Sequence, residues 1–188
     1  MAEENPLDQI KGRTFSMFEE NGKGRILWNV FRGTISFTIM ENGSRVENKP
    51  IWDETRVALL DTFNGILQGK STGVTITASK KKSRESRERV TDYVMSIGLT
   101  EKRTIYFDVN LGSGNRRFNL GRVTNIQVGT DKMTDADQSQ IRASVFIDWL
   151  TNIAPIEMVM TSRKFEKKDG GSGGGWGKSN NDSDNAFG

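Results

Sequence analysis

Alternating apolar and polar positions predict β-strands in two parts of the chain. In residues 34–40, isoleucine and phenylalanine alternate with threonine and serine, which is the period of a strand with one buried face. Residues 103–110 alternate in the same way and place Tyr106 on the face opposite the apolar side chains. The residues that these two patterns predict in the core are Ile35, Phe37, Ile39, Ile105, Phe107 and Val109.

Shorter patterns predict further strands, separated by turns. Asn42-Gly43 is a tight-turn signal, and residues 111–115 are typical of a hairpin loop. Gly121 is expected to form a bulge, whereas residues 90–96 fit either a strand or a helical turn. The remaining predicted strands are residues 13–19, 25–32, 72–78 and 116–128.

Two segments have the apolar spacing of amphipathic helices. The first is residues 52–67, and the second runs from Thr134 to about residue 152, where Thr134 and Asp137 have the spacing of a capping box. Pro155 is expected to interrupt or kink the chain that follows. The predicted buried stripes comprise Trp52, Leu59, Leu60, Phe63, Ile66 and Leu67 in the first helix, and Ile141, Val145, Phe146, Trp149 and Leu150 in the second.

The order of these elements predicts an α+β fold with antiparallel strands. Strands, a helix, strands and a second helix occupy residues 13–168, which we expect to form one domain. Residues 1–12 are polar and are expected to be flexible. Residues 169–188 begin with a glycine-rich stretch that cannot bury a core, so disorder is expected there.

Composition excludes several classes of chemistry. The chain has no cysteine and no histidine, which removes thiolate and imidazole metal sites and every Ser-His-Asp arrangement. Its acidic residues form no convincing cluster, so we expect no enzyme, no metal and no cofactor. No apolar run approaches the roughly 20 residues of a membrane span, and the absence of cysteine suits a cytoplasmic location.

Charge is distributed unevenly along the chain. Residues 169–188 contain three aspartates and one lysine, a net charge of −2. Since the whole chain carries +3, the residues before this tail carry +5. A basic body with an acidic tail suggests two separate functions.

The first candidate for function is a basic segment that follows a predicted strand. Cations in such number neutralise phosphates and release counterions, which gives affinity for nucleic acid without sequence preference. The alternative is a solvated loop, in which the charges only keep the surface polar. The cations are Lys80, Lys81, Lys82, Arg84, Arg87 and Arg89, accompanied by Glu85 and Glu88.

The second candidate is a set of aromatic residues and arginines interleaved on predicted strands. Proteins that bind single-stranded nucleic acid stack bases on such rings and hold the backbone with cations. The alternative places Phe118 and at least one of Trp28 and Phe31 in the core, and Tyr106 is the best stacking candidate. The predicted binding residues are Arg25, Trp28, Phe31, Arg32, Arg103, Tyr106, Arg116, Arg117 and Arg122.

The third candidate is the end of the tail. Asp182 and Asp184 precede Phe187, so a flexible acidic segment presents one aromatic side chain to a partner protein. The alternative is an inert solubilising tail.

A basic body, a glycine-rich linker and an acidic end with Phe187 together resemble the layout of bacterial and phage single-stranded DNA-binding proteins. The chain departs from the bacterial pattern because Gly188 follows the phenylalanine. Strands followed twice by a helix resemble Whirly and PUR-type folds more than an OB barrel, and also the single-stranded DNA-binding RNA polymerase cofactors of N4-like phages.

This resemblance implies sequence-tolerant binding of single-stranded DNA in phage replication or transcription, by a homo-oligomer. One alternative is a transcription cofactor that acts mainly by contacting RNA polymerase. Another is a structural or assembly protein without nucleic-acid binding.

Overall fold

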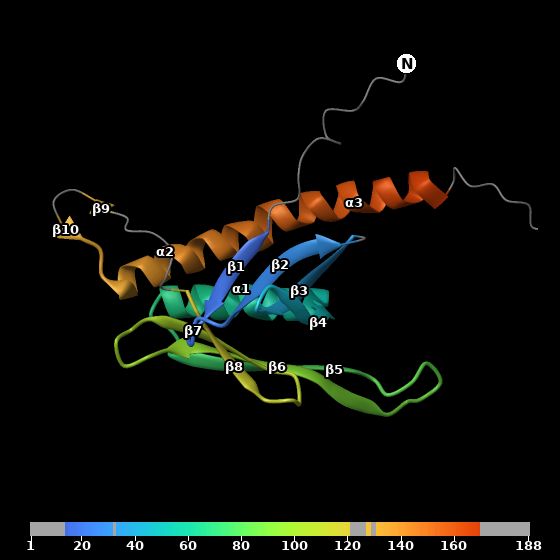
Figure 1. The fold of residues 1–188 in the computed structure, drawn as a ribbon, viewed down its shortest axis with the longest axis horizontal. Helices are drawn as coiled ribbons and strands as arrows, with labels where there is room; N and C mark the ends of the chain where they lie inside the picture. Colours follow the sequence, from blue (N-terminus) through green and yellow to red (C-terminus); the bar gives the residue numbers. More distant parts are fainter. Residues whose placement is uncertain (1–13, 32, 121–126, 129–130, 170–188) are drawn as a thin grey trace, which may run out of the picture.

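Four strands followed by a helix occur twice along the chain (Figure 1). The computed structural model describes residues 14–31, 33–120, 127–128 and 131–169. The first set comprises β1 (Phe15–Glu19), β2 (Gly24–Phe31), β3 (Thr34–Glu41), β4 (Ser44–Pro50) and α1 (Asp53–Leu67). The second comprises β5 (Gly73–Lys81), β6 (Arg89–Leu99), β7 (Ile105–Asn110), β8 (Asn115–Asn119) and α2 (Asp135–Asp148), with the short pair β9 (Gln127–Val128) and β10 (Asp131–Lys132) before α2.

The eight longer strands form one antiparallel sheet in the order β4-β3-β2-β1-β8-β7-β6-β5. Each set of four is a meander, and the two meanders meet where Phe18 and Glu19 of β1 pair with Asn119 and Phe118 of β8. The predicted α+β class with an antiparallel sheet is therefore confirmed. β4, the last strand of the first meander, and β5, the first strand of the second, are the two edges of the sheet.

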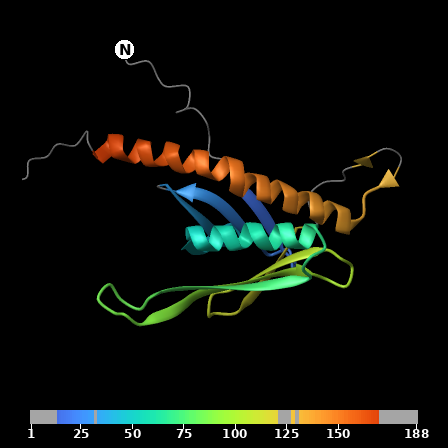
Figure 2. The same ribbon diagram turned by 180° about the vertical axis from the view of Figure 1, so that it is seen from behind.

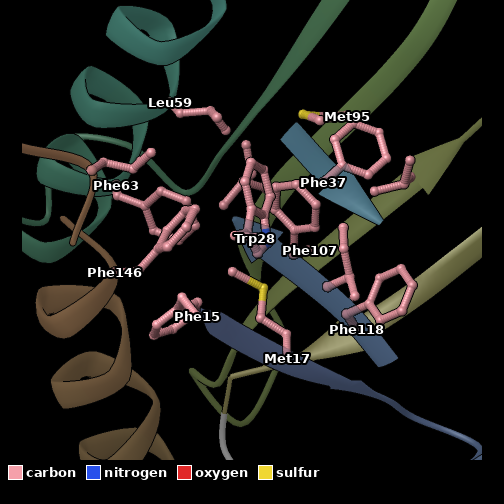
Figure 3. Close-up of a cluster of buried hydrophobic side chains, with 14 of the residues drawn as sticks. Phe15, Met17, Trp28, Phe37, Leu59, Phe63, Met95, Phe107, Phe118 and Phe146 are labelled. Atoms are coloured by element: carbon pink, nitrogen blue, oxygen red, sulfur yellow. The ribbon is translucent and has the colours of Figure 1, made fainter. Parts of the chain in front are cut away.

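The sheet curves around a core that both halves share. Trp28 of β2 and Phe107 of β7 belong to opposite halves, yet their ring centroids lie 5.5 Å apart. The ring centroid of Phe146 in α2 lies 4.8 Å from that of Trp28 and 5.3 Å from that of Phe63 in α1 (Figure 3). The helices therefore close the concave side of the sheet. All six core residues predicted from strand alternation are buried.

The helices all lie on this inner side of the sheet. α1 packs against α2 and against β5 and β6, while the continuation of α2 runs along β2 and β3 (Figures 1 and 2). Among the described residues, none of the helices is long and apolar enough to cross a bilayer.

The second helix does not stop at Pro155, but its α-helical hydrogen bonding is interrupted just before this proline. Thr134 and Asp137 form the expected capping box at its start. The helix then passes through a π-helical segment, η2 (Trp149–Ile153), into α3 (Ala154–Asp169), and the Ala154 N–H donates to the Trp149 carbonyl. A proline lacks the N–H and crowds the carbonyl one turn earlier; a local change to wider hydrogen-bond spacing accommodates both.

Other expectations about secondary structure are corrected in detail. β4 has a polar sequence without a regular apolar face, and no strand was predicted there. Residues 90–96 belong to a strand rather than a helical turn, and the strand predicted over 116–128 is continuous only to Asn119. Gly121 lies outside the described residues, as do residues 1–12 and 170–188.

Two residues predicted on the buried stripes of the helices are exposed instead. Trp52 precedes α1 as its N-cap and is 49% exposed, and Val145 of α2 is also exposed. Leu59, Phe63 and Ile66 of α1 are buried as expected, as are Phe146, Trp149 and Leu150 of the second helix.

Candidate nucleic-acid interface

The outer side of the sheet, which we call the open face, is not covered by any helix of the described residues. Residues directly opposite one another in antiparallel strands point to the same face, so register shows which side chains share it. One row of partners runs on this face through all eight strands and across the meeting point of the two meanders. We call it the junction row; it consists of Gly73, Gly98, Tyr106, Asn119, Phe18, Arg25, Met40 and Arg45.

Tyr106 lies across the backbone of the neighbouring strand β6. A Cβ atom at Gly98 would be 2.7 Å from the Tyr106 hydroxyl oxygen, closer than side chains tolerate. Gly98 therefore leaves the space that lets the phenol ring lie over β6, as an aromatic side chain does when it covers a glycine in a sheet. The prediction that Tyr106 points away from the core is confirmed.

Arg117 holds its guanidinium over the Tyr106 ring. The guanidinium carbon is 4.4 Å from the ring centroid, and two nitrogens donate to the Asp108 carboxylate at 2.8 Å each. These hydrogen bonds raise the pKa of Arg117 above its ordinary value. Asp108 thus fixes the orientation of the guanidinium and offsets much of its charge.

A hollow of about 770 Å³ lies beside the junction of the two meanders. Phe18, which is 42% exposed, and Tyr106 both line it, with Asn119 between them in the row. Acidic side chains also line the hollow, among them Glu20 and Glu101. The site therefore offers the exposed ring of Phe18 and the half-buried ring of Tyr106 under Arg117, in a surrounding where acidic side chains outnumber cationic ones.

Two predicted binding residues belong to the interior of the protein instead. Trp28 is 0% exposed in the centre of the core, so it is unable to stack on a base. Arg116 points to the opposite face from Arg117 and forms ion pairs with Glu19 at 2.9 Å and Glu41 at 3.2 Å. The hydrogen bonds to Glu19 raise the pKa of Arg116. Arg116 thus joins the two halves of the sheet.

The predicted basic segment forms the tip of the β5–β6 hairpin. We call residues 80–89 the basic hairpin; they contain six cations and two glutamates, a net charge of +4. Lys82 pairs with Glu88 at 2.9 Å, whereas Lys81, Arg84 and Arg87 are exposed. Arg89 pairs with Lys81 in register, and its guanidinium donates to the Ser79 hydroxyl and carbonyl.

The basic hairpin is separate from the junction row. Gly98, where β6 crosses the junction row, lies nine residues from Arg89, which corresponds to about 30 Å of strand. The structure therefore divides the predicted surface into an aromatic site and a cationic site, connected along β5 and β6.

An ion-pair cluster around the buried Asp92 carboxylate anchors the base of the hairpin. The Asp92 carboxylate accepts from Lys80 at 2.9 Å and from Lys49 of β4 at 3.0 Å. Burial alone would raise the pKa of Asp92, but the hydrogen bonds from Lys80 and Lys49 outweigh it and lower that pKa. Burial opposes the charge of Lys49 as well, yet its hydrogen bond to Asp92 raises the pKa of the lysine.

The other predicted residues lie apart from both sites or outside the described chain. Phe31 is exposed at the end of β2, and Arg103 is exposed in the β6–β7 turn with a φ of 61°. Arg25 is exposed in the junction row. Arg32, Arg122, Asp182, Asp184 and Phe187 lie outside the described residues.

Sequence reasoning missed three residues of these sites. Phe18 and Arg45 were not singled out, although both lie in the junction row. Trp52 was assigned to a buried helix stripe but lines a second hollow, of about 580 Å³, beside Lys80, Lys81 and Arg89. The signal that could have indicated its exposure is its position just before Asp53 and Glu54, the acids of the first helical turn.

Among the residues that the structure describes, no group of acidic side chains is arranged to hold a metal ion. Comparisons with protein-family models, with curated proteins and with solved structures gave no match. The function must therefore be argued from the two surfaces themselves.

Proposed function

We propose that this protein binds single-stranded DNA with little sequence preference and has no catalytic role. The observation that carries the proposal is the junction row, which presents Tyr106, Phe18 and Arg25 together on a face that no described helix covers. One base stacks on the Phe18 ring and another on the flat surface that Tyr106 and the overlying Arg117 guanidinium form, and the basic hairpin holds the phosphates of the same strand.

Stacking supports a single-stranded ligand over a duplex. The face of a base is accessible to a protein ring only when the base is unpaired and unstacked, and every base has such a face, so recognition tolerates sequence. Duplex readers usually insert a helix into the major groove. Here α1 and α2 pack against the inner side of the sheet, where they bury Phe63 and Phe146.

Charge supports the second half of the proposal. The net charge of +4 over the basic hairpin lies on a projecting tip, where phosphates approach without meeting the acidic side chains around Tyr106. Phosphate neutralisation there supplies affinity that depends strongly on salt.

The proposed biological role rests on the resemblance in layout to single-stranded DNA-binding proteins. We propose a role in phage replication or transcription as a homo-oligomer in the host cytoplasm, with Asp182, Asp184 and Phe187 recruiting RNA polymerase or a replication protein. These three tail residues lie outside the described part of the chain.

The test is fluorescence anisotropy of labelled oligo-dT with the full chain at two salt concentrations, with unlabelled duplex and RNA of equal length as competitors. We expect binding that weakens as salt rises, together with poor competition by duplex. Equal affinity for duplex and single strand would contradict the proposal, because stacking would then contribute nothing.

A further inference from the structure

We propose that Trp52 and the base of the basic hairpin form a second base-stacking subsite for single-stranded DNA, at the edge strand β5. This inference rests on the proposed function and extends it, because it assigns a binding site away from the junction row. The ligand is one nucleotide of the bound strand, with its base on the Trp52 ring and its phosphate on Lys81 and Arg89.

Trp52 is exposed and lines a hollow at the surface. Tryptophan is large and apolar, and an exposed tryptophan in a hollow often marks an interaction site. Trp52 is 49% exposed, whereas Trp28 and Trp149 are buried. Its hollow of about 580 Å³ has the volume of a small-ligand pocket, and it lies open at the surface beside β5.

The charged side chains around this hollow are mostly positive. Lys80, Lys81 and Arg89 line it together with a single acid, Glu54. Lys80 is paired with the Asp92 carboxylate, whereas Arg89 donates only to the uncharged Ser79 and keeps its net charge, so Lys81 and Arg89 are the phosphate contacts. Asp53 and Glu54 occupy the first turn of α1, so the phosphate lies on the hairpin side of the ring rather than at the helix end.

The chain just before Trp52 is fixed by hydrogen bonds to neighbouring strands. The Ile51 N–H donates to the Ile35 carbonyl at 2.8 Å, and the Tyr93 hydroxyl donates to the Pro50 carbonyl at 3.2 Å. Asp92, next to Tyr93, holds both Lys49 and Lys80. The tryptophan and the hairpin are thus joined to one scaffold, and a subsite built on a rigid scaffold loses less entropy on binding.

The subsite is connected to the junction row around the edge of the sheet. That row ends on β5 at Gly73, and Ala78, which lines the hollow, lies five residues further along the same strand, about 17 Å away. Because side chains alternate along a strand, Ala78 points to the inner side with its buried partner Tyr93, whereas Thr75 and Thr77 are exposed on the open face. Thr77 also lines the hollow, and β5 is an edge of the sheet, so a single strand of DNA can pass from the open face around this edge to Trp52.

The experiment separates total binding from contact with the tryptophan. Anisotropy of labelled oligo-dT of about 16 nucleotides measures total affinity for the wild-type chain, Trp52→Ala, Trp52→Phe and Val57→Ala. Val57 is an exposed apolar residue of the same helix and serves as the matched control. Intrinsic tryptophan emission is recorded in a Trp176→Phe background, since Trp176 lies outside the described residues.

We expect Trp52→Ala to weaken binding about 5- to 100-fold, the effect of losing one stacked base. Trp52→Phe should restore most of the affinity, and Val57→Ala should match the wild type. Oligo-dT should quench the emission in the Trp176→Phe background, and the added change Trp52→Phe should abolish that quenching, because Trp28 and Trp149 are buried.

The outcomes distinguish this inference from the proposed function. If the wild type binds oligo-dT but Trp52→Ala binds equally well and the quenching survives Trp52→Phe, the subsite is overturned and the proposed function stands. If the wild type fails to bind oligo-dT, both are overturned. Thermal unfolding of each variant shows whether lost affinity reflects lost folding; Trp52→Phe keeps the test valid if Trp52→Ala is unstable.

Discussion

The surroundings of Tyr106 and the basic hairpin differ in how their cationic side chains are paired. Next to Tyr106, Arg117 is held by two hydrogen bonds to Asp108 and lies over the ring, so its charge is largely offset and its geometry is set. In the hairpin, Lys81, Arg84 and Arg87 are exposed and outnumber the nearby acids. A paired arginine provides a flat contact surface of fixed geometry, whereas exposed cations attract phosphates over longer distances.

Because of this difference, binding at the two surfaces should depend differently on salt concentration. Stacking on a ring depends little on ionic strength, whereas each phosphate contact contributes to the slope of log affinity against log salt. Changes in the row should therefore lower affinity at every salt concentration, and changes in the hairpin should lower the slope as well.

Removing exposed charge from the hairpin should have the largest effect. For Lys81→Gln, Arg84→Gln and Arg87→Gln combined, we expect the salt slope to fall by about 2, since a single strand loses roughly 0.7 per phosphate contact. On the same basis, affinity near ~0.1 M salt should fall on the order of a hundredfold. Oligo-dT titrations at several salt concentrations measure both quantities.

The control for net charge combines Lys23→Gln and Lys70→Gln, two exposed lysines in turns away from the hairpin. It should change the slope little. An equal loss of slope per charge removed in this control would show that binding follows overall charge rather than the hairpin.

Removal of the Tyr106 ring should have the next largest effect. We expect Tyr106→Ala to weaken binding by about 1 to 3 kcal/mol with an unchanged salt slope, because one stacked base is lost and no phosphate contact is. Tyr106→Phe keeps the ring and should bind as the wild type does. A changed slope in Tyr106→Ala would show that the row and the hairpin are not separable.

Loss of the Asp92 anchor should affect stability. We expect Asp92→Asn to lower the free energy of unfolding by about 2 kcal/mol at neutral pH, since hydrogen bonds to a buried charged group are lost. The pKa of Asp92 is lowered in the folded protein, so its contribution is present above the unfolded pKa and is lost as pH falls through the folded pKa. The difference between wild type and variant should therefore begin to shrink as the pH falls below about 4 and disappear only below the folded pKa of Asp92.

Urea unfolding of both proteins across this pH range measures the effect, with the exposed Asp61→Asn on α1 as the control. A difference that persists at low pH would show that Asp92 acts through packing and not through its charge.

Arg117→Lys should have the smallest effect. The charge is retained, but the two-pronged contact with Asp108 and the flat contact with Tyr106 are lost. We expect binding weaker by about 0.5 to 1 kcal/mol with the same salt slope. Arg25 lies in the junction row and has no ring contact among the described residues, so Arg25→Lys should bind like the wild type. A similar loss of affinity in Arg25→Lys would indicate a phosphate contact at this position instead.

Local patterns were sufficient for most of the elements. Alternation identified β3 and β7 together with the face on which Tyr106 lies, and Asn42 and Gly43 have the positive φ angles that their turn signal predicts. The capping box at Thr134 was also read correctly. β4 was missed because its polar residues carry no period, and it is a strand only because β3 offers it a partner.

The candidate sites depended more on contacts between distant parts of the chain. The tryptophans of β2 and of the α1 N-cap each follow an aliphatic residue, Leu27 or Ile51, yet Trp28 is in the core and Trp52 is at the surface. Arg116 and Arg117 are adjacent, but Arg116 is paired with Glu19, 97 residues earlier, and Arg117 lies on the other face.

Local sequence patterns were enough to locate most of the strands, the helix starts, the outward direction of Tyr106 and the concentration of positive charge in residues 80–89. These properties depend on neighbours within a few residues, which periodicity and turn chemistry report directly. Only the tertiary structure decided that Phe18 joins Tyr106 in one row, that Trp28 is buried, and that Trp52 lies beside the hairpin. Strand order and burial arise from pairings between residues far apart, which local patterns do not specify.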